Sequence, residues 1–382
     1  MVDPIECVAT CRPGLESVLQ SELVESGIRK PRKAKRAVHF TTNQAGLYRL
    51  NMALRSAIQI LVPIRTFNAP DYERLYFQAR KTNWHKYFEN GNTIRIDVNG
   101  RSPSLRNTQY VVHRVKDGIV DTFRKLSGGV RPSIDKDAPD VHVVVHLDGQ
   151  KVTLCLDSSG VPLFKRGYRL EHGGAPLKED LAAGILLMSG LEKQTGLVDP
   201  MCGSGTFLFE GWMILNGIAP NLNRSFAFQN WLDYDEDTYL RERQRLSDRE
   251  NLNPSIPVIG CDIDEETHAL AERIRDTHFG ESGIQLTNGP FQEFIAEIPE
   301  GLLVTNPPYG ERMGNAEELT KLYVDLGYAA KRFVPGGRMA VFTANRKAAK
   351  QIRMKAEGAK TLFNGAIEGL LFEYSIRGPR PD

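Results

Sequence analysis

The sequence GLVDPMCGSGTFLFEGWMIL, at residues 196–215, is the stretch that decides the fold of this chain. Its first residues are typical of a short buried strand, and the apolar run from Phe207 predicts a helix. Between them, Gly203 and Gly205 permit close approach to the backbone, and the helix start presents free amides that favour an anion such as the carboxylate of a nucleoside amino acid. No Lys-Ser or Lys-Thr follows the last glycine, and the glycine spacing differs from the dinucleotide fingerprint. The loop is therefore neither a P-loop nor a dinucleotide-binding loop.

A second strand-like segment, VIGCDID, follows about 60 residues later at residues 258–264 and ends in carboxylates. Asp262 at this point is able to accept hydrogen bonds from both hydroxyl groups of a ribose. A solvated strand end is the simpler interpretation. The position of the segment after the glycine loop favours the ribose.

The sequence GLLVTNPPYGER, at residues 301–312, predicts a buried strand that runs into a rigid turn, because two prolines fix φ and remove backbone donors. Asn306 offers a side-chain carbonyl, Pro307 a backbone carbonyl and Tyr309 an aromatic face. These groups suit a planar base with an exocyclic amine. The two acceptors would take the amine hydrogens and point the nitrogen lone pair at an electrophile, while the base stacks on Tyr309. The simpler alternative is a turn that ends a strand and exposes a tyrosine.

The segments that follow the glycine loop alternate between strand and helix patterns. Strands are expected at residues 284–287, 302–305, 339–343 and 370–376, with a helix at 319–333. This alternation predicts an α/β fold with a doubly wound, mostly parallel sheet. Ligands bind beyond the carboxyl ends of such strands, so Asp199, Asp262 and Asn306 are expected around one crevice.

Three motifs in this order, at residues 199–206, 262–264 and 306–312, resemble the class I S-adenosylmethionine-dependent methyltransferases that methylate amines. The whole chain resembles the RlmL family of 23S rRNA guanine-N2 methyltransferases, through FKRGYR at 164–169, APLKE at 175–179 and ATCRPGLE at 9–16. The resemblance implies three domains. These are a ferredoxin-like segment at residues 1–60, a THUMP RNA-binding domain at 61–160 and a Rossmann-like methyltransferase domain at 161–382.

The resemblance also implies a cofactor, S-adenosylmethionine, with S-adenosylhomocysteine as its product and no metal. The implied cofactor-binding residues are Asp199, Pro200, Cys202, Gly203, Gly205, Thr206, Asp262, Ile263, Asn288, Asn306, Lys178 and Glu179. The implied catalytic residues are Asn306, Pro307 and Tyr309.

Two positions depart from the family pattern. Asp180 stands where the family usually has Thr, and no acidic residue follows the third strand to meet the adenine amine. Asn288 and Phe291 are the candidates to replace that acid.

The first half of the chain predicts smaller α+β units. A strand at residues 7–10, a helix at 14–26, a strand at 37–41 and a helix at 47–60 form a β-α-β-α order. Further on, helices are expected at residues 72–81 and 110–126, a strand at 93–98, and a hairpin made of 141–147 and 151–157.

Basic residues of this half suggest structured RNA as a partner, although the net charge of the chain is only +2. Six of the eight residues from Arg29 to Arg36 are basic, a density that suits phosphate contacts, with a solvated loop as the alternative. The candidate RNA contacts are Arg32, Lys33, Arg36, Arg106, Arg114, Arg166 and Arg169. The resemblance favours 23S rRNA, and tRNA is a second choice.

Composition excludes several other classes of protein. The chain has 382 residues, 41% of them hydrophobic and 25% charged, and no apolar run approaches the ~18 residues of a membrane span. The N-terminus lacks a signal peptide, so a cytoplasmic protein is expected. Five cysteines without C-x-x-C spacing argue against disulfides and structural zinc, and are expected to be buried thiols. Oligomeric state is left open.

Three alternatives to guanine-N2 methylation of 23S rRNA remain at this point. They are N6-adenine methylation, guanine-N2 methylation of tRNA, and a non-catalytic RNA-binding assembly factor. The insertion at residues 218–257, rich in aromatic residues and arginine, predicts either a cap over the active site or a surface that stacks nucleobases.

Overall fold

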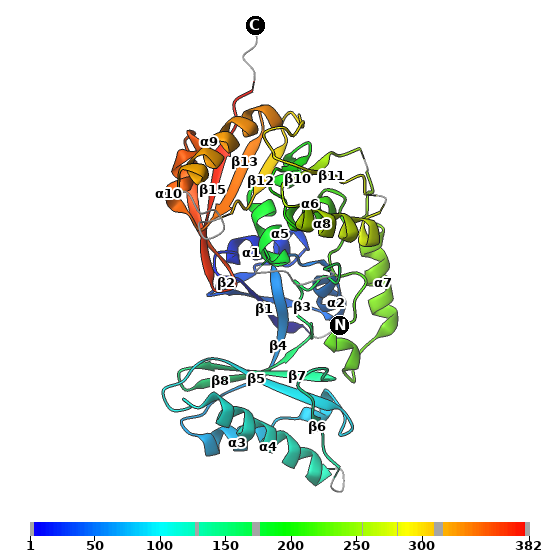
Figure 1. The fold of residues 1–382 in the computed structure, drawn as a ribbon. Coiled ribbons are helices and arrows are strands. Elements are labelled where there is room, and N and C mark those ends of the chain that lie inside the picture. The colour runs from blue at the N-terminus through cyan, green and yellow to red at the C-terminus, as the bar shows by residue number, and fades with distance from the viewer. Residues whose placement is uncertain are drawn as a thin grey trace.

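The computed structural model describes residues 4–126, 130–169, 176–253, 255–280, 282–308 and 316–378, which form two sheets with helices (Figure 1). The strands are β1 (Ile5–Cys11), β2 (Arg32–Ala34), β3 (Ala37–Thr42), β4 (Ala57–Asn68), β5 (Thr93–Arg101), β6 (Ser133–Ile134), β7 (Val141–Asp148), β8 (Lys151–Asp157), β9 (Leu197–Asp199), β10 (Val258–Asp262), β11 (Gln285–Asn288), β12 (Leu302–Thr305), β13 (Arg338–Thr343), β14 (Gly358–Asn364) and β15 (Ile367–Ser375). The α-helices are α1 (Glu16–Glu25), α2 (Gln44–Ala53), α3 (Tyr72–Arg80), α4 (Thr108–Leu126), α5 (Glu179–Met188), α6 (Thr206–Leu215), α7 (Glu236–Ser247), α8 (Glu265–His278), α9 (Ala316–Phe333) and α10 (Arg346–Ala349). Short 3-10 helices are η1 (Trp84–Lys86), η2 (Leu191–Lys193), η3 (Ala227–Asn230) and η4 (Lys350–Ile352).

The N-terminal sheet is shared by two domains, and its strand order in the described residues is β2-β3-β1-β4-β8-β7-β5-β6. The long strand β4 belongs to both domains, since Leu61 pairs with Val8 of β1 and Asn68 pairs with Lys151 of β8. The register shifts just after Pro63, a residue that has no N–H to offer the ladder. The domain boundary predicted at residues 60–61 therefore falls within a continuous strand.

The helix predicted at residues 47–60 is wrong in its second half. Helix α2 ends at Ala53, and Leu54 is extended with a ψ of 127°. The segment AIQILVPIRTFN that follows is strand β4, whose alternating β-branched residues fit a pleated surface. In this conformation β4 fills the position between β1 and β8, where both of its edges are hydrogen-bonded.

The C-terminal sheet has the order β11-β10-β9-β12-β13-β15-β14. The neighbouring strands β11, β10, β9, β12 and β13 pair in parallel, and β15 and β14 add an antiparallel edge. The prediction of a doubly wound, mostly parallel sheet is confirmed, but strand β14 was not predicted. On β12, Leu302 and Val304 pack in the core on the side of α5 and α6, whereas Leu303 packs against α9 on the other face (Figure 1). Burial on both faces explains why this strand is apolar throughout.

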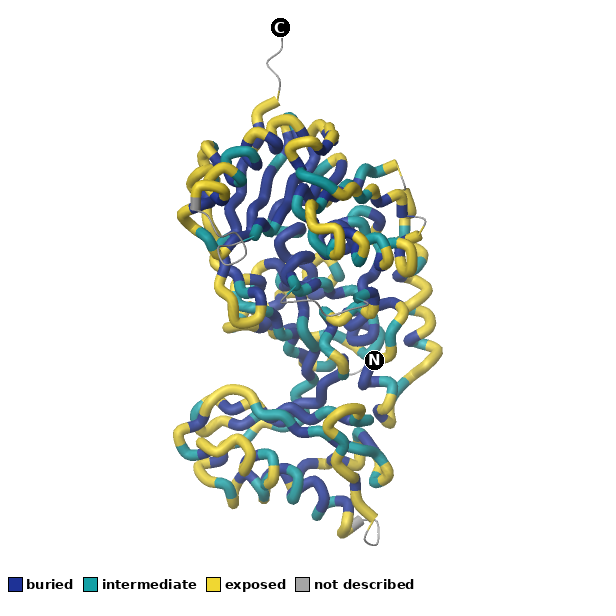
Figure 2. Tube along the Cα trace, in the orientation of Figure 1, coloured by how far each residue is buried: buried dark blue, intermediate teal, exposed yellow. Residues whose placement is uncertain are grey.

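The N-terminal domain packs firmly on the C-terminal domain. One buried apolar cluster contains Leu15, which directly precedes α1, and Leu186 of α5, and Figure 2 shows burial continuing between these parts. The side chain of Arg12 pairs with Asp180 at 2.8 Å, and Asp180 is fully buried. This pair gives a structural reason for an acid at a position where Thr was expected, because a buried guanidinium needs an anionic partner.

The structure contradicts both roles that were predicted for the insertion at residues 218–257. Its described residues do not line the cavity at the carboxyl ends of the C-terminal strands. Phe228 instead stacks on Tyr48 of α2, with ring centroids 4.4 Å apart, and Arg49 of α2 pairs with Glu242 of α7 at 2.7 Å. The aromatic residues are buried because they attach the ferredoxin-like domain to the methyltransferase domain, which leaves their faces unavailable to nucleobases.

Candidate active site at the carboxyl ends of the C-terminal strands

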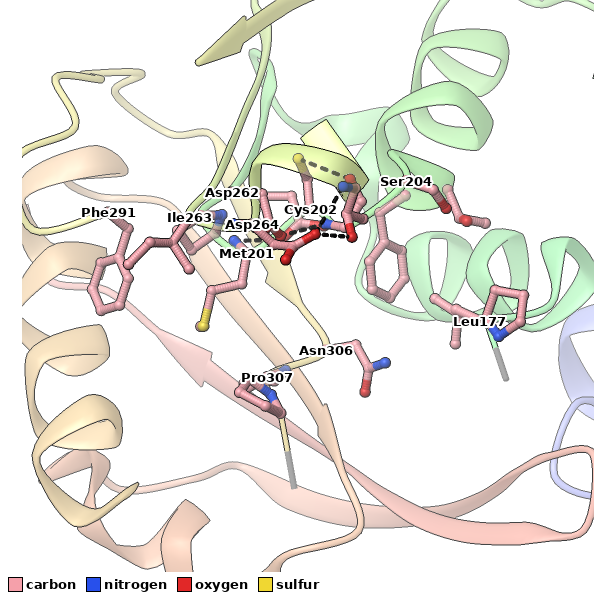
Figure 3. A pocket seen from close by; sticks show the side chains of 18 of the residues that line it. Leu177, Met201, Cys202, Ser204, Asp262, Ile263, Asp264, Phe291, Asn306 and Pro307 are labelled. Carbon is pink, nitrogen blue, oxygen red and sulfur yellow. Dashed lines mark hydrogen bonds between the residues drawn. The ribbon is translucent and has the colours of Figure 1, made fainter. Parts of the chain in front are cut away.

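A cavity of about 1570 Å³ lies at the carboxyl ends of β9, β10, β12 and β13 (Figure 3). Residues of all three sequence motifs line it, including Asp199, Gly203, Asp262 and Asn306. The strand order places β9 between β10 and β12, so the chain reverses its winding direction beside β9. Such a switch point is where open α/β sheets bind ligands.

The glycine loop is held against strand β10 by hydrogen bonds. The backbone N–H of Gly203 donates to a carboxylate oxygen of Asp262 at 2.7 Å, and the N–H of Cys202 donates to the carbonyl of Cys261 at 2.9 Å. Gly203 and Gly205 have φ values of 52° and 81°, in the left-handed region that favours glycine. Asp262 therefore organises the loop in addition to facing the cavity, a role that sequence reasoning did not assign.

Two buried acidic groups near the loop have raised pKa values. Burial, together with the nearby charge of Asp262, raises the pKa of Asp199 to about 8. Burial raises the pKa of the Cys202 thiol well above its usual value. Cys202 is therefore a neutral thiol rather than an activated nucleophile, and it serves as a small residue in the loop.

Asn306 directly follows strand β12 and lies on the opposite side of the cavity from the glycine loop (Figure 3). Among the described residues, its side-chain oxygen has no hydrogen-bond partner although the atom is buried. Buried carbonyls are nearly always satisfied, so an unpaired one at a cavity wall is available to accept a hydrogen bond from a ligand. Pro307 also lines the cavity, and Tyr309 lies outside the described residues.

Arg169 lines the cavity and was assigned to RNA by the sequence prediction. Its Nε donates to Glu179 at 2.9 Å, and its Nη2 donates to the carbonyl of Leu177 at 3.0 Å. The same nitrogen lies 3.5 Å from the hydroxyl of Thr206, the first residue of α6. The guanidinium is thus fixed beside the N-terminus of that helix. Glu179 therefore affects the site by holding Arg169 in place. The backbone N–H of Lys178 donates to the side-chain oxygen of Asn364 at 3.2 Å.

The wall formed after β11 differs from the sequence prediction. Asn288 is exposed and is absent from the cavity lining, and its side chain donates to the carbonyl of Asp262 at 3.0 Å. The cavity is lined instead by the next residues, including Phe291 and Gln292, and by Ile263, which is 72% exposed. Gln292 was not predicted as a site residue because it lies outside the three sequence motifs.

The remaining candidate RNA contacts have different environments. Arg32, Lys33 and Arg36 are exposed around the β2–β3 hairpin, as is Arg106 before α4. Arg114 pairs with Glu73 at 2.7 Å. The side chain of Arg166 is 1% exposed and pairs with buried Glu210 at 3.4 Å, so its prediction as an RNA contact is wrong. Its charge is required inside the protein, where it neutralises a buried carboxylate.

In the part of the chain that the structure describes, no group of three or more His, Cys, Asp or Glu side chains is arranged to hold a metal ion. None of the described helices is long and apolar enough to cross a membrane. All five cysteines are free and buried, which confirms the prediction of buried thiols.

The sheet order, the glycine loop and the position of the cavity define the C-terminal half as a Rossmann-like methyltransferase domain. Residues 166–373 match the family model of the RMKL-like methyltransferase domain. Residues 69–157 match the THUMP domain, and residues 6–61 match the RlmL ferredoxin-like domain. The chain belongs to the RMKL-like methyltransferase family.

Several known proteins are similar to this chain. Ribosomal RNA large subunit methyltransferase K/L of Cellvibrio japonicus is 38% identical over 381 residues, which cover 96% of this chain and 51% of that protein. The chain thus spans about half the length of this relative. A crystal structure from Clostridium difficile 630, described as a possible methylase, is 29% identical with a TM-score of 0.88 and full coverage of both chains. Another structure, provisionally described as a methyltransferase and solved with S-adenosylhomocysteine, is 28% identical with a TM-score of 0.85 and full coverage of both.

Proposed function

We propose that this chain transfers a methyl group from S-adenosylmethionine to the exocyclic N2 of a guanine in RNA, with 23S rRNA as the substrate and the cytoplasm as the place of action. The observation that carries the proposal is the buried, unpaired side-chain oxygen of Asn306, within the described residues, at the cavity wall. Family membership and the similarity to large-subunit rRNA methyltransferase K/L support the reaction type and the RNA.

The residues of the cavity fit the cofactor at three points. The carboxylate of Asp262 suits the ribose hydroxyls, and Ile263 and Phe291 offer apolar surface to the adenine. The guanidinium of Arg169 and the N-terminus of α6 suit the carboxylate of the amino-acid end, because both favour an anion. Asn288, turned toward the backbone of β10, is not needed for this arrangement.

The chemistry requires alignment more than acid or base strength. When bound, S-adenosylmethionine supplies a methyl group on a sulfonium that is already a good leaving group. Asn306 accepts a hydrogen bond from the target amine and so directs the nitrogen lone pair toward the cofactor side of the cavity. The carbonyl of Pro307 and the ring of Tyr309 remain proposed as the second acceptor and the stacking surface. Positioning of this kind lowers the barrier by fixing the reacting atoms before they meet.

The test is single-turnover transfer of a labelled methyl group to unmodified 23S rRNA, followed by digestion and identification of the labelled nucleoside. N2-methylguanosine is expected. Labelled N6-methyladenosine would show that the target base is adenine instead of guanine. Transfer to tRNA alone would show that the substrate is tRNA instead of 23S rRNA. If calorimetry shows no binding of S-adenosylmethionine to the folded protein, the proposal is wrong and a non-catalytic RNA-binding role takes its place.

A further inference from the structure

Charge is divided across the cavity on the two sides of Asn306. On the β9 and β10 side the lining includes the carboxylates of Asp262 and Asp264. On the other side, directly after β13, the lining includes Arg346 and Lys347. Strand β12 lies between β9 and β13 in the sheet, and Asn306 directly follows it. The turn that carries Asn306 therefore lies between the acidic side and the basic side of the cavity.

The other two cations of the cavity wall are already engaged. Arg169 is held by Glu179, and Arg273 also interacts within the protein. In contrast, Arg346 and Lys347 are exposed, and in the residues that the structure describes neither side chain forms an ion pair or a hydrogen bond. Two unpaired cations at a cavity wall are available for an anionic ligand.

The backbone that carries these two cations is held in place. The side chain of Asn345 accepts from the N–H of Ala348 at 3.0 Å, and the N–H of Asn345 donates to the hydroxyl of Thr343 at 3.0 Å. That hydroxyl is 2.8 Å from the hydroxyl of buried Tyr323. Arg346 and Lys347 therefore project from a fixed turn beside Asn306, so less ordering is needed when a ligand binds.

The size of the cavity leaves space for a nucleotide beside a cofactor. Its volume of about 1570 Å³ exceeds the roughly 300–1,000 Å³ that is usual for a pocket that binds one small ligand. A base that leaves its stack for chemistry brings the phosphates on both sides of its sugar close to the protein. The carboxylates on the β9 and β10 side would repel these phosphates, and the cations after β13 would attract them.

We propose that Arg346 and Lys347 bind the phosphates that flank the target nucleotide, so that RNA reaches Asn306 from the β13 side of the cavity. This inference rests on the proposed function and adds an RNA-binding site within the methyltransferase domain itself. The candidate contacts Arg32, Lys33 and Arg36 belong to the N-terminal sheet, so these two cations form a separate contact close to the reacting atoms.

The experiment compares two full-length double variants that lose the same charge. One is Arg346→Ala with Lys347→Ala, and the control is Lys350→Ala with Lys355→Ala, two exposed cations that are absent from the cavity lining. Binding of unmodified 23S rRNA is measured over a series of salt concentrations with S-adenosylhomocysteine present. The cavity variant should bind about tenfold more weakly, and its plot of log affinity against log salt should be less steep by about 1.4, because two phosphate contacts are lost. Affinity for S-adenosylhomocysteine should stay at the wild-type value.

The possible results separate this inference from the proposed function. If the cavity variant matches the control in RNA affinity and salt dependence, the phosphate site is wrong while the methyltransferase assignment stands. If the wild-type protein binds S-adenosylhomocysteine but methylates no RNA, the proposed function fails and this inference fails with it. Should the double variant lose S-adenosylhomocysteine binding through misfolding, the single variants Arg346→Gln and Lys347→Gln provide the test. Each should show about half of the change in salt dependence that is expected for the double variant.

Discussion

The two sheets of this protein carry their predicted functional residues in different places. In the N-terminal sheet, the candidate RNA contacts lie on an exposed hairpin and beside a helix, where several cations contribute independently. In the C-terminal sheet, the residues of the cavity lie where parallel strands end, and hydrogen bonds within the protein hold several of them in position. The comparison predicts small, additive effects for changes in the first region and large, specific effects for changes in the second.

The largest effect is expected for Asn306→Ala. Loss of the side-chain carbonyl should lower the single-turnover rate of methyl transfer by about 100-fold to 1,000-fold, the range seen when one preorganised hydrogen-bonding group is removed from an active site. Affinity for S-adenosylhomocysteine should change little, because Asn306 is proposed to contact the target amine. Asn288→Ala, at an exposed position outside the cavity lining, is the matched control. A wild-type rate in folded Asn306→Ala would refute the mechanism.

Asp262→Ala should weaken binding of S-adenosylhomocysteine by on the order of 1.5 to 3 kcal/mol, because a charge-assisted contact to the ribose is lost. The change also removes the acceptor for the N–H of Gly203, which disturbs the glycine loop. Calorimetric titration measures the effect, and RNA affinity at constant salt should remain near wild type. Undiminished cofactor affinity in a folded variant would rule out the ribose assignment.

Arg169→Gln should distinguish two ligands that differ only at the amino-acid end. Affinity for S-adenosylhomocysteine should fall by about 1.5 to 3 kcal/mol, because a charge-assisted contact to its carboxylate is lost. Affinity for 5′-methylthioadenosine, which lacks that carboxylate, should stay the same. Titration of both ligands into both proteins measures the difference, and equal losses for the two ligands would assign Arg169 to the structure of the site instead.

A smaller effect is expected in the N-terminal sheet when Arg32, Lys33 and Arg36 are changed together to Ala. Each phosphate contact contributes about 0.7 to 0.9 to the slope of log affinity against log salt, so the loss of three contacts should decrease the slope by about 2.1 to 2.7. Methyl transfer at saturating RNA should be unaffected. The control changes the exposed residues Lys331, Lys350 and Lys355 of the methyltransferase domain to Ala. An unchanged slope in the first variant would contradict RNA binding by this hairpin.

The smallest effect concerns stability and His142, which bridges Asp157 at 2.9 Å and Asp97 at 2.8 Å across the N-terminal sheet. Burial lowers the pKa of His142, but the hydrogen bonds and charges of the two carboxylates outweigh it and raise the pKa above its usual value. The stabilisation is therefore fully present below the unfolded-state pKa of about 6.5 and is lost as pH rises through the higher folded-state value. His142→Gln should reduce the free energy of unfolding by on the order of 1 kcal/mol at about pH 5.5, and by less at about pH 9. Denaturant unfolding at both pH values measures the difference, and a loss that grows with pH would contradict the charged bridge.

Sequence patterns were sufficient where one local rule decides the structure. Strand β12 was predicted with its observed bounds because Leu302 to Thr305 is an uninterrupted apolar and β-branched run followed by prolines. Asp199, Asp262 and Asn306 were expected in one crevice because parallel strands end at the same edge, and all three line one cavity. The same rule would have drawn attention to Arg346 and Lys347, which lie just beyond the strand predicted at residues 339–343.

Tertiary structure decided the features that depend on a distant partner. Arg166 and Arg169 stand three residues apart in one basic segment, yet the first neutralises buried Glu210 and the second faces the cavity beside Glu179. The sequence around the two arginines predicts that both side chains are exposed to solvent. Only the packing of α5 and α6 gives them different environments. The first four residues of strand β4, 57–60, were predicted as part of a helix because their pattern is apolar in either conformation, and the open edges of β1 and β8 select the strand. The sequence by itself thus determined the order of the elements around the glycine loop, since those signals are local, whereas the environment of each charged side chain was set by the other segments that fold against it.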